Sequence, residues 1–259
     1  GVPAEIDMQR FASLVDMLSD SCKRFAHLPA YRSMGVAMSF RELDEASHAF
    51  AAWLQGSAGL QRGDRVALMM PNLLQYPVAL FGILRAGMVV VNVNPLYTPR
   101  ELKHQLRDAD VRAIVVLENF AHTLEQVIAE TAVRKVVTTE VGDLLPTLKR
   151  LLTNAVVKHV KKMVPAWRLP GSVRWRDALA AGRALPLAAL PLGHDDLAFL
   201  QYTGGTTGVA KGAQLSHGNM VANVLQVGAW MSPNLREGQE TLILPLPMYH
   251  VFALTGALS

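Results

Sequence analysis

The sequence contains a single cysteine, Cys22, among its 259 residues. One cysteine cannot form a disulfide within the chain, and it cannot supply a cysteine-based zinc cluster. Any chemistry must therefore come from other residue types. A chain that uses so little cysteine is expected in a reducing compartment, which predicts the cytoplasm.

Long hydrophobic runs are also missing. The most apolar stretch, residues 78–93, is interrupted by Arg85 and two glycines, so it cannot supply the roughly 20 apolar residues of a membrane-spanning helix. The first residues have neither the basic region nor the apolar region of a secretory signal, and none is expected. A composition of 51% hydrophobic and 18% charged residues predicts a soluble globular protein with a sizeable core.

Acidic residues are absent between positions 144 and 176, although this stretch contains eight lysines and arginines. The net charge of the whole chain is only +4, so the remainder is net negative. The uneven distribution indicates one local anionic partner rather than a generally basic protein.

Within this basic segment, apolar residues recur at helical spacing from position 148 to 163. One interpretation is an interfacial helix that docks on the anionic inner face of the cytoplasmic membrane. The other is an ordinary amphipathic helix whose apolar stripe packs on the domain. The sequence is compatible with both interpretations. Nucleic acid is not expected, because aromatic residues are not interleaved with the basic ones. The basic residues proposed to face a membrane are Lys149, Arg150, Lys158, Lys161 and Lys162.

Short apolar strands alternate with helices along most of the chain. Such alternation predicts a doubly wound α/β fold, with a mostly parallel sheet covered by helices on both faces. The segment 144–192 does not follow this rhythm and is predicted to be an irregular basic insertion. A hairpin is expected at residues 30–38. Helices are predicted at 11–25, 39–55, 75–86, 98–108 and 121–131, and strands at 65–70, 88–93, 111–117, 133–138 and 196–202.

The stretch from Tyr202 to Ala213 contains four glycines, three threonines and one lysine. Glycines let backbone amides approach a ligand, threonine hydroxyls can bind phosphate oxygens or Mg²⁺, and a lysine adds a positive charge. The pattern predicts a phosphate-binding loop for ATP, with Thr203 or Thr206 as a candidate Mg²⁺ ligand. The predicted phosphate-binding residues are Tyr202, Thr203, Gly204, Gly205, Thr206, Thr207, Gly208, Lys211 and Gly212.

Two other interpretations fit the residues of this loop less well. The Walker loop of P-loop NTPases requires glycine before the lysine and serine or threonine after it, whereas this chain has Ala210 and Gly212 at those positions. A flexible glycine-rich turn with no ligand is disfavoured by the spacing of the threonines and the lysine.

The loop resembles the phosphate-binding signature of the adenylate-forming superfamily, which includes acyl- and aryl-CoA ligases. Thr206-Thr207-Gly208 and Lys211-Gly212 match that signature, and Ala210 stands where proline is common. Residues 215–220 resemble the segment that follows the loop in this superfamily, and residues 246–255 resemble its aromatic-histidine motif. The amino-acid sequence of the loop is similar to that of bacterial long-chain fatty-acid–CoA ligases.

The resemblance implies that a long-chain fatty acid attacks the α-phosphate of ATP to form an acyl-adenylate and pyrophosphate. Coenzyme A then displaces AMP, and Mg²⁺ assists with the phosphates. Tyr249 and His250 would border the acyl-adenylate site, and His250 is the only candidate catalytic residue in the chain. The alternative for His250 is a hydrogen-bonded loop histidine without a catalytic role. His217 is expected to anchor the turn into the next helix and not to act as a general base.

Ligases of this superfamily are about twice as long as this chain. Residues 1–259 therefore resemble the N-terminal portion of the large adenylation domain, and the remaining motifs, with the small C-terminal domain, would lie beyond Ser259. On this basis the chain alone is expected to have little ligase activity. Two rival interpretations stay open: a ligase for another carboxylic acid, and a noncatalytic nucleotide- or lipid-binding module. The sequence does not predict an oligomeric state.

Overall fold

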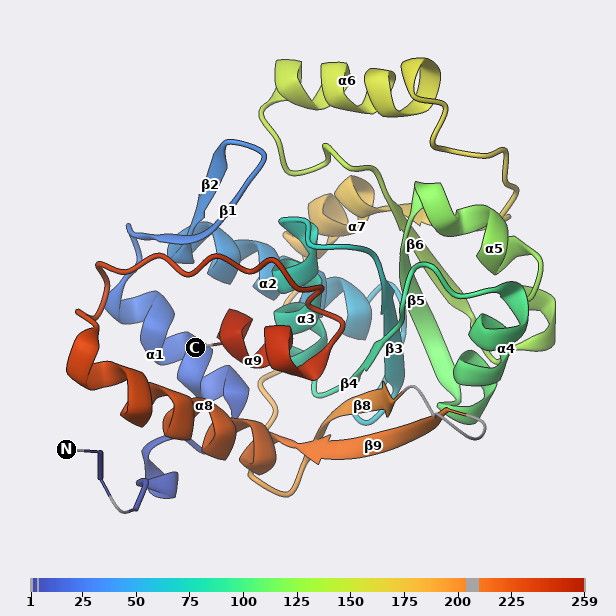
Figure 1. Ribbon diagram of the computed structural model, residues 1–259. Helices are drawn as coiled ribbons and strands as arrows, with labels where there is room; N and C mark the ends of the chain where they lie inside the picture. Colours follow the sequence, from blue (N-terminus) through green and yellow to red (C-terminus); the bar gives the residue numbers. More distant parts are fainter. Residues whose placement is uncertain (1, 4, 204–209, 259) are drawn as a thin grey trace.

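The computed structural model describes residues 2, 3, 5–203 and 210–258. Its centre is a seven-stranded sheet in the order β7-β6-β5-β3-β4-β8-β9 (Figure 1). Neighbouring strands are parallel, except that β9 runs antiparallel to β8. The strands are β3 (Arg65–Met69), β4 (Val89–Asn92), β5 (Val111–Leu117), β6 (Lys135–Thr139), β7 (Val173–Arg174), β8 (Leu197–Thr203) and β9 (Lys211–Ser216).

Helices cover both faces of this sheet, which confirms the predicted α/β fold. Along β3, Val66 and Leu68 enter one hydrophobic core, whereas Ala67 and Met69 enter the other, as the alternation of side chains across a strand requires. The first core is covered by α1 (Leu14–Arg24), α2 (Phe40–Gln55), α3 (Gln75–Arg85), α7 (Trp175–Gly182), α8 (His217–Met231) and α9 (Val251–Leu258). The second is covered by α4 (Pro99–Asp108) and α5 (Ala121–Glu125).

Two of the predicted helices begin with a capping box. The Ser39 hydroxyl accepts a hydrogen bond from the backbone N–H of Glu42, whose carboxylate accepts one from the backbone N–H of Ser39 at 2.7 Å. Thr98 and Glu101 form the same reciprocal capping box at the start of α4. Each box satisfies backbone donors that the first helical turn leaves without partners. The predicted hairpin is also present, as β1 (Pro29–Ser33) and β2 (Val36–Ser39).

Some boundaries differ from the prediction. The first helix begins at Leu14, because Ser13 caps it by accepting a hydrogen bond from Asp16. The helix predicted over 121–131 is α5 followed by a separate 3₁₀ turn, η3 (Ile128–Glu130), since Val127 leaves the helical conformation (φ −125°) with its side chain buried in the second core. Further short 3₁₀ turns are η1 (Met8–Arg10), η2 (Glu118–Phe120) and η5 (Ser232–Asn234).

The segment predicted to be an irregular insertion, 144–192, contains regular structure. Its strand β7 pairs in parallel with β6, and its helix α7 packs against α2. Trp175 of α7 is fully buried, with its ring centroid 4.7 Å from that of Phe50. The sequence pattern missed these elements because β7 has two residues and α7 only eight, too few for a clear periodicity.

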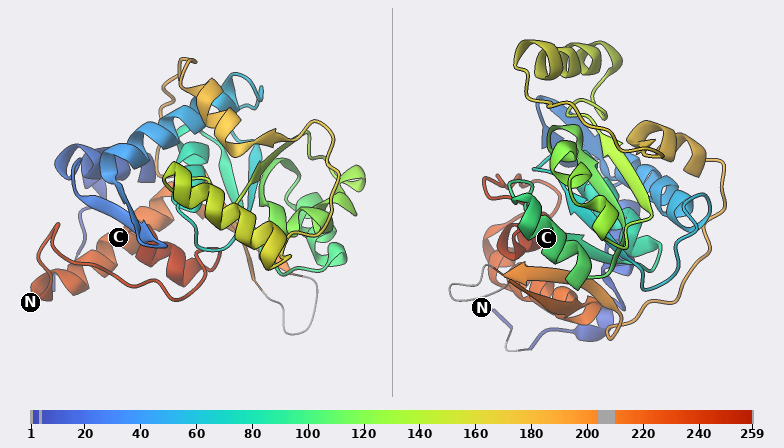
Figure 2. Two further views of the ribbon diagram at one scale, coloured as in Figure 1. Left: turned by 90° about the horizontal axis from the view of Figure 1, so that it is seen from above. Right: turned by 90° about the vertical axis from the view of Figure 1, so that its right-hand side faces the viewer.

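The helix α6 (Thr147–Ala155) stands off from the sheet (Figures 1 and 2) and continues into a π-helical turn, η4 (Val156–Val160). No residue of either element is buried. The interpretation of the apolar stripe as packing on the domain is therefore wrong within the described residues. None of the described helices combines the length and the apolar character that a bilayer crossing requires.

Candidate functional site

The predicted phosphate loop connects the two strands of a hairpin. Thr203 at the end of β8 and Lys211 at the start of β9 are register partners, and both are exposed. The loop leaves the carboxyl edge of a parallel strand, where open α/β sheets bind ligands. It leads into a strand, whereas a Walker loop leads into a helix, which is a second reason against the Walker interpretation. Outside the described residues lie Gly204, Gly205, Thr206, Thr207 and Gly208, and their phosphate-binding roles stay predictions.

Tyr202 and Gly212 face each other across this hairpin. A Cβ added at Gly212 would lie 2.9 Å from the Tyr202 ring. Because glycine has no side chain, it leaves room for this ring. The Tyr202 side chain is buried, and its hydroxyl donates to the carboxylate of Asp108 at the end of α4. Burial, followed by the hydrogen bond to Asp108, raises the pKa of Tyr202. These contacts give both residues a packing role, and a contact with phosphate stays a prediction.

The segment that carries Tyr249 and His250 is tied to the sheet through backbone groups. The side-chain amide of Gln201 donates to the Tyr249 carbonyl at 2.8 Å. Asn72 donates to the Leu246 carbonyl at 2.9 Å and accepts from the backbone N–H of Met248 at 2.8 Å. Two side chains at the carboxyl edge of the sheet thus set the course of this otherwise irregular segment.

A buried polar network is hydrogen-bonded to one of these anchors, Gln201. Asn92, the last residue of β4, donates to Gln201 at 3.0 Å and accepts from the Tyr76 hydroxyl at 2.6 Å. Gln105 of α4 donates to the Asn92 carbonyl at 2.8 Å. All four side chains are at most 7% exposed. Sequence reasoning missed this network, although polar residues within apolar strands were a usable signal, because buried polar groups need partners.

Tyr249 and His250 lie together as predicted, with ring centroids 4.7 Å apart and planes inclined by 45°. Tyr97, which follows β4, also lies near them: burial, then Glu101 and Tyr249, raise its pKa. The imidazole of His250 is exposed and makes no hydrogen bond to any described residue. That arrangement disfavours the alternative of a hydrogen-bonded structural histidine and leaves the ring free to contact a ligand.

His217 is a structural anchor, as expected. It is 1% exposed, and its Nδ1 accepts a hydrogen bond from the backbone N–H of Leu14 at 3.2 Å. Burial lowers the pKa of His217 to about 4, against the opposing effect of Asp196. A neutral imidazole with one nitrogen committed to a backbone donor joins the start of α8 to the start of α1, and the absence of a general-base role stays a prediction.

The described residues offer little for a metal ion. They contain no group of three or more His, Cys, Asp and Glu side chains arranged to hold one. The Thr203 hydroxyl is exposed at the mouth of the loop, whereas Thr206 lies outside the described residues. A Mg²⁺ ligand role for either threonine stays a prediction.

The sequence is highly similar to bacterial proteins that carry one name. It is 59% identical to a long-chain-fatty-acid–CoA ligase of Escherichia coli O157:H7 over 98% of this chain and 45% of that protein. The ligase of the same name from Haemophilus influenzae is 54% identical over 96% of this chain and 45% of that protein. The chain therefore spans slightly less than half the length of these curated relatives.

Solved structures share the fold. A long-chain-fatty-acid–CoA ligase from Archaeoglobus fulgidus matches with a TM-score of 0.75 and 22% identity, over 100% of this chain and 46% of that one. A protein described as a putative ligase of this type, from Rhodopseudomonas palustris, matches with a TM-score of 0.77 and 18% identity, over 96% and 55%. The AMP-binding enzyme family matches residues 18–259, nearly the whole chain, and the chain therefore belongs to that family of AMP-binding enzymes.

Proposed function

We propose that the protein carrying this chain is an ATP-dependent long-chain-fatty-acid–CoA ligase. The observation that carries the proposal is 54–59% identity to proteins of that name over 96–98% of the chain. The site is consistent with it, because β8, the strand that leads into the glycine- and threonine-rich loop, contacts the aromatic-histidine segment through Gln201.

The chemistry explains why such a site needs few catalytic groups. A carboxylate at neutral pH is a poor electrophile. Its attack on the α-phosphate of ATP breaks the bond to the β-phosphate, releases pyrophosphate and creates an acyl-adenylate, from which AMP is a good leaving group. The thiol of coenzyme A then forms the thioester. The protein must mainly hold two anions together and stabilise charge on the phosphates. Backbone amides of 204–208 and the Lys211 ammonium would provide this stabilisation.

The acyl-adenylate would lie beside the Tyr249–His250 segment. Gln201 and Asn72 hold the backbone of that segment, which would help to keep the two rings beside the acyl-adenylate. Mg²⁺, when bound, would neutralise phosphate charge, with a hydroxyl of Thr203 or Thr206 as the ligand from this chain. Because Mg²⁺ accepts oxygen ligands and retains waters, the phosphates of ATP would provide much of the remaining shell.

Isotope exchange between pyrophosphate and ATP tests the adenylation step directly. In the full-length protein, palmitate should stimulate exchange. Lys211→Ala should reduce the rate about tenfold or more, because one charge-assisted contact to phosphate is lost. Lys23→Ala removes an equal, exposed charge in α1 and should leave the rate unchanged. Exchange that is insensitive to Lys211→Ala would contradict the proposal.

The same assay separates the two rivals. A 4-coumarate–CoA ligase-like protein of Oryza sativa is 30% identical over 86% of this chain and 35% of that protein, so 4-coumarate belongs in the panel beside palmitate. Stronger exchange with 4-coumarate would indicate a ligase for another acid. Binding of ATP without exchange for any acid would indicate a noncatalytic module.

We also propose that α6 and η4 dock on an anionic membrane surface, which would place the protein peripherally on the cytoplasmic membrane. The outward face of α6 carries apolar side chains at helical spacing: Leu148, Leu151 and Leu152 are 82%, 59% and 63% exposed. Burying one leucine in an apolar phase is favourable by about 1.5–3 kcal/mol. Three exposed leucines on one standing-off helix are therefore a costly arrangement in water.

The charges of this segment are less available than the sequence indicated. The Lys149 ammonium donates to the Met34 carbonyl in the β1–β2 turn, and Lys158 lies 3.5 Å from the Glu118 carboxylate. Arg150, Lys161 and Lys162 have no partner among the described residues. Each basic side chain near an anionic leaflet contributes about 1 kcal/mol, so the leucines would provide most of the affinity and the three free cations the lipid preference.

Sedimentation of the full-length protein with vesicles tests this docking. Vesicles that contain phosphatidylglycerol should bind the protein more tightly than pure phosphatidylcholine, and high salt should remove the difference. Leu148→Ser with Leu151→Ser should weaken binding to both. Leu96→Ser, at a 76% exposed leucine outside α6, is the matched control. Binding unaffected by the α6 variant would contradict the proposal, and loss of an oligomer in that variant would identify a protein partner instead.

A further inference from the structure

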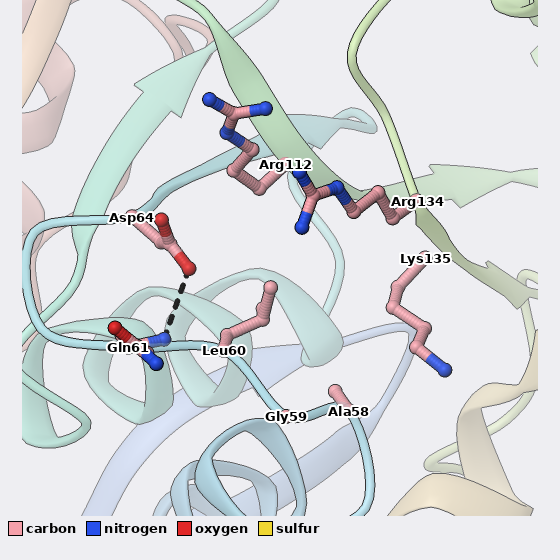
Figure 3. Close-up of a pocket in the computed structure, with 8 residues that line it drawn as sticks. All are labelled: Ala58, Gly59, Leu60, Gln61, Asp64, Arg112, Arg134 and Lys135. Carbon is pink, nitrogen blue, oxygen red and sulfur yellow. Dashed lines mark hydrogen bonds between the residues drawn. The ribbon is translucent and has the colours of Figure 1, made fainter.

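A cavity of about 310 Å³ opens where β3, β5 and β6 begin (Figure 3). It lies at the amino edge of the sheet, whereas the predicted phosphate loop and the Tyr249–His250 segment lie at the carboxyl edge. A strand as long as β5 spans about 20 Å, so the cavity is separate from the proposed adenylation site. Nothing in the proposed ligase mechanism uses it.

One wall of this cavity is cationic. Arg112 is the second residue of β5, and Arg134 and Lys135 stand at the start of the neighbouring β6. The backbone N–H of Arg134 donates to the Arg112 carbonyl at 2.8 Å, which holds the two arginines side by side. In Figure 3 the Arg134 side chain reaches across the cavity toward the connection between α2 and β3.

These cations are only partly neutralised. Arg112 donates to Asp110 at 2.8 Å, and Asp110 also accepts from Arg65. Within the described part of the chain, neither Arg134 nor Lys135 has an ion pair or a side-chain hydrogen bond. Like charges at adjacent positions of neighbouring strands repel each other, and an anion between them would relieve that repulsion.

The opposite wall carries two apolar side chains beside polar ones. Ala58 and Leu60 are each 7% exposed and form part of the connection between α2 and β3. Asp64 is the only acidic lining residue among those described, and one of its oxygens accepts from the backbone N–H of Gln61 at 2.9 Å. The cavity therefore sets a wall with two apolar side chains and one carboxylate against a wall with an excess of positive charge.

We infer that this cavity binds a small phosphorylated molecule. Its phosphate, with nearly two negative charges at neutral pH, lies against Arg134 and Lys135, with the Arg112 guanidinium on the far side of Arg134. Its organic part covers Ala58 and Leu60. Arginine and lysine are both common phosphate ligands. Helices at this edge present their C-termini, as α4 does just before β5, so side chains rather than a helix dipole must hold the anion.

Calorimetric titration with inorganic phosphate and with pyrophosphate tests the site. The full-length protein carries Thr206→Ala, Thr207→Ala and Lys211→Ala in this experiment, so that binding at the predicted ATP loop does not contribute. Saturable binding is expected, and Arg134→Gln with Lys135→Gln should weaken it about tenfold or more, since two charge-assisted contacts are lost. The charge-conserving pair Arg134→Lys with Lys135→Arg should retain most of the affinity.

The control pair is Arg183→Gln with Lys23→Gln, which removes the same charge at exposed positions outside the cavity. It should bind like the parent, and an equal loss in the control would contradict a defined site. Saturable binding that is absent, or that survives Arg134→Gln with Lys135→Gln, would also overturn the inference. Hydrogen exchange on the unmutated cavity provides a second measurement: phosphate should slow exchange at residues 58–64 and 134–135, and unchanged rates would contradict the proposal even if the variant does not fold.

Discussion

The backbone N–H of Leu14 donates a hydrogen bond to Nδ1 of His217, 203 positions further along the chain. This bond joins the first residue of α1 to the first residue of α8, and both ends are buried. Because Leu14 stands at a helix start, its N–H has no partner within the helix. The histidine therefore supplies a hydrogen bond that water cannot.

The first prediction concerns the pH dependence of stability. Burial lowers the pKa of His217 to about 4 in the folded state, whereas an unfolded histidine titrates near about 6.5. Between these values the unfolded state binds more protons, so the free energy of unfolding should fall as pH falls from about 6.5 to about 4, by about 2–4 kcal/mol in total. Urea unfolding at several pH values measures this, and His217→Asn should flatten the slope. An unchanged slope in that variant would assign the pH dependence to other groups.

The second prediction concerns the anchor of the aromatic-histidine segment. Gln201→Leu removes the donor to the Tyr249 carbonyl and the acceptor of Asn92, which leaves buried polar groups unpaired and should cost about 1–3 kcal/mol. Hydrogen exchange should accelerate over residues 242–250, and the KM for the fatty acid should rise. Gln214→Leu is the matched control, because this exposed glutamine lies in the neighbouring strand β9. Equal effects of the two variants would show that the amide contact is unimportant.

The third prediction concerns the hairpin that carries the phosphate loop. A Cβ at Gly212 would lie 2.9 Å from the Tyr202 ring, so Gly212→Ala should destabilise the protein by about 1–3 kcal/mol. In a Tyr202→Leu background the same change should cost much less, because the ring that it would strike is absent. A double-mutant cycle by chemical denaturation measures this coupling. Additive effects would mean that the hairpin relaxes around the new methyl group.

The fourth prediction uses two glycines that are both in helices. A Cβ at Gly182 of α7 would lie 1.9 Å from the Ala49 carbonyl oxygen of α2, whereas a Cβ at Gly228 of α8 would meet nothing within 4 Å. Gly182→Ala should therefore force the two helices apart and cost about 3 kcal/mol or more. Gly228→Ala should stabilise the protein by about 0.5–1 kcal/mol, because alanine is the better helix former. Thermal unfolding distinguishes the two, and a loss of stability in Gly228→Ala would contradict this reading of α8.

Local signals in the sequence were sufficient for the elements with strong patterns. The apolar strand β3 and the capped helices α2 and α4 are where they were expected, because a capping box or a run of buried residues is encoded within a few neighbouring positions. The sequence patterns did not predict the shorter elements β9 and α7. The strand β9 is half-exposed and contains a glycine, and α7 is recognisable mainly through Trp175, whose partner Phe50 is distant in sequence.

The residues of the candidate site also fall into those that a local motif predicts and those that only the structure shows. Tyr249 and His250 were identified from their own motif, and the glycine- and threonine-rich loop from its composition, although its central residues lie outside the described part of the chain. The sequence did not point to the polar side chains that hold this segment, Gln201, Asn92 and Asn72. Their roles depend on hydrogen bonds to groups that are distant in the sequence. Likewise, only the structure separated Lys149 and Lys158, which have partners in the chain, from Lys161 and Lys162.

The sequence by itself determined the α/β class, the starts of α2 and α4 and the residue types of a phosphate loop, because these follow from propensity, periodicity and contacts between near neighbours. Tertiary structure alone decided that the apolar stripe of α6 faces outward, that His217 bonds to the start of α1, and that Arg112, Arg134 and Lys135 share one cavity. Each of these depends on segments that are distant in the sequence but meet in space. Whether a side chain is buried, or its charge neutralised, where two such segments pack together depends on both segments. Neither segment alone predicts it.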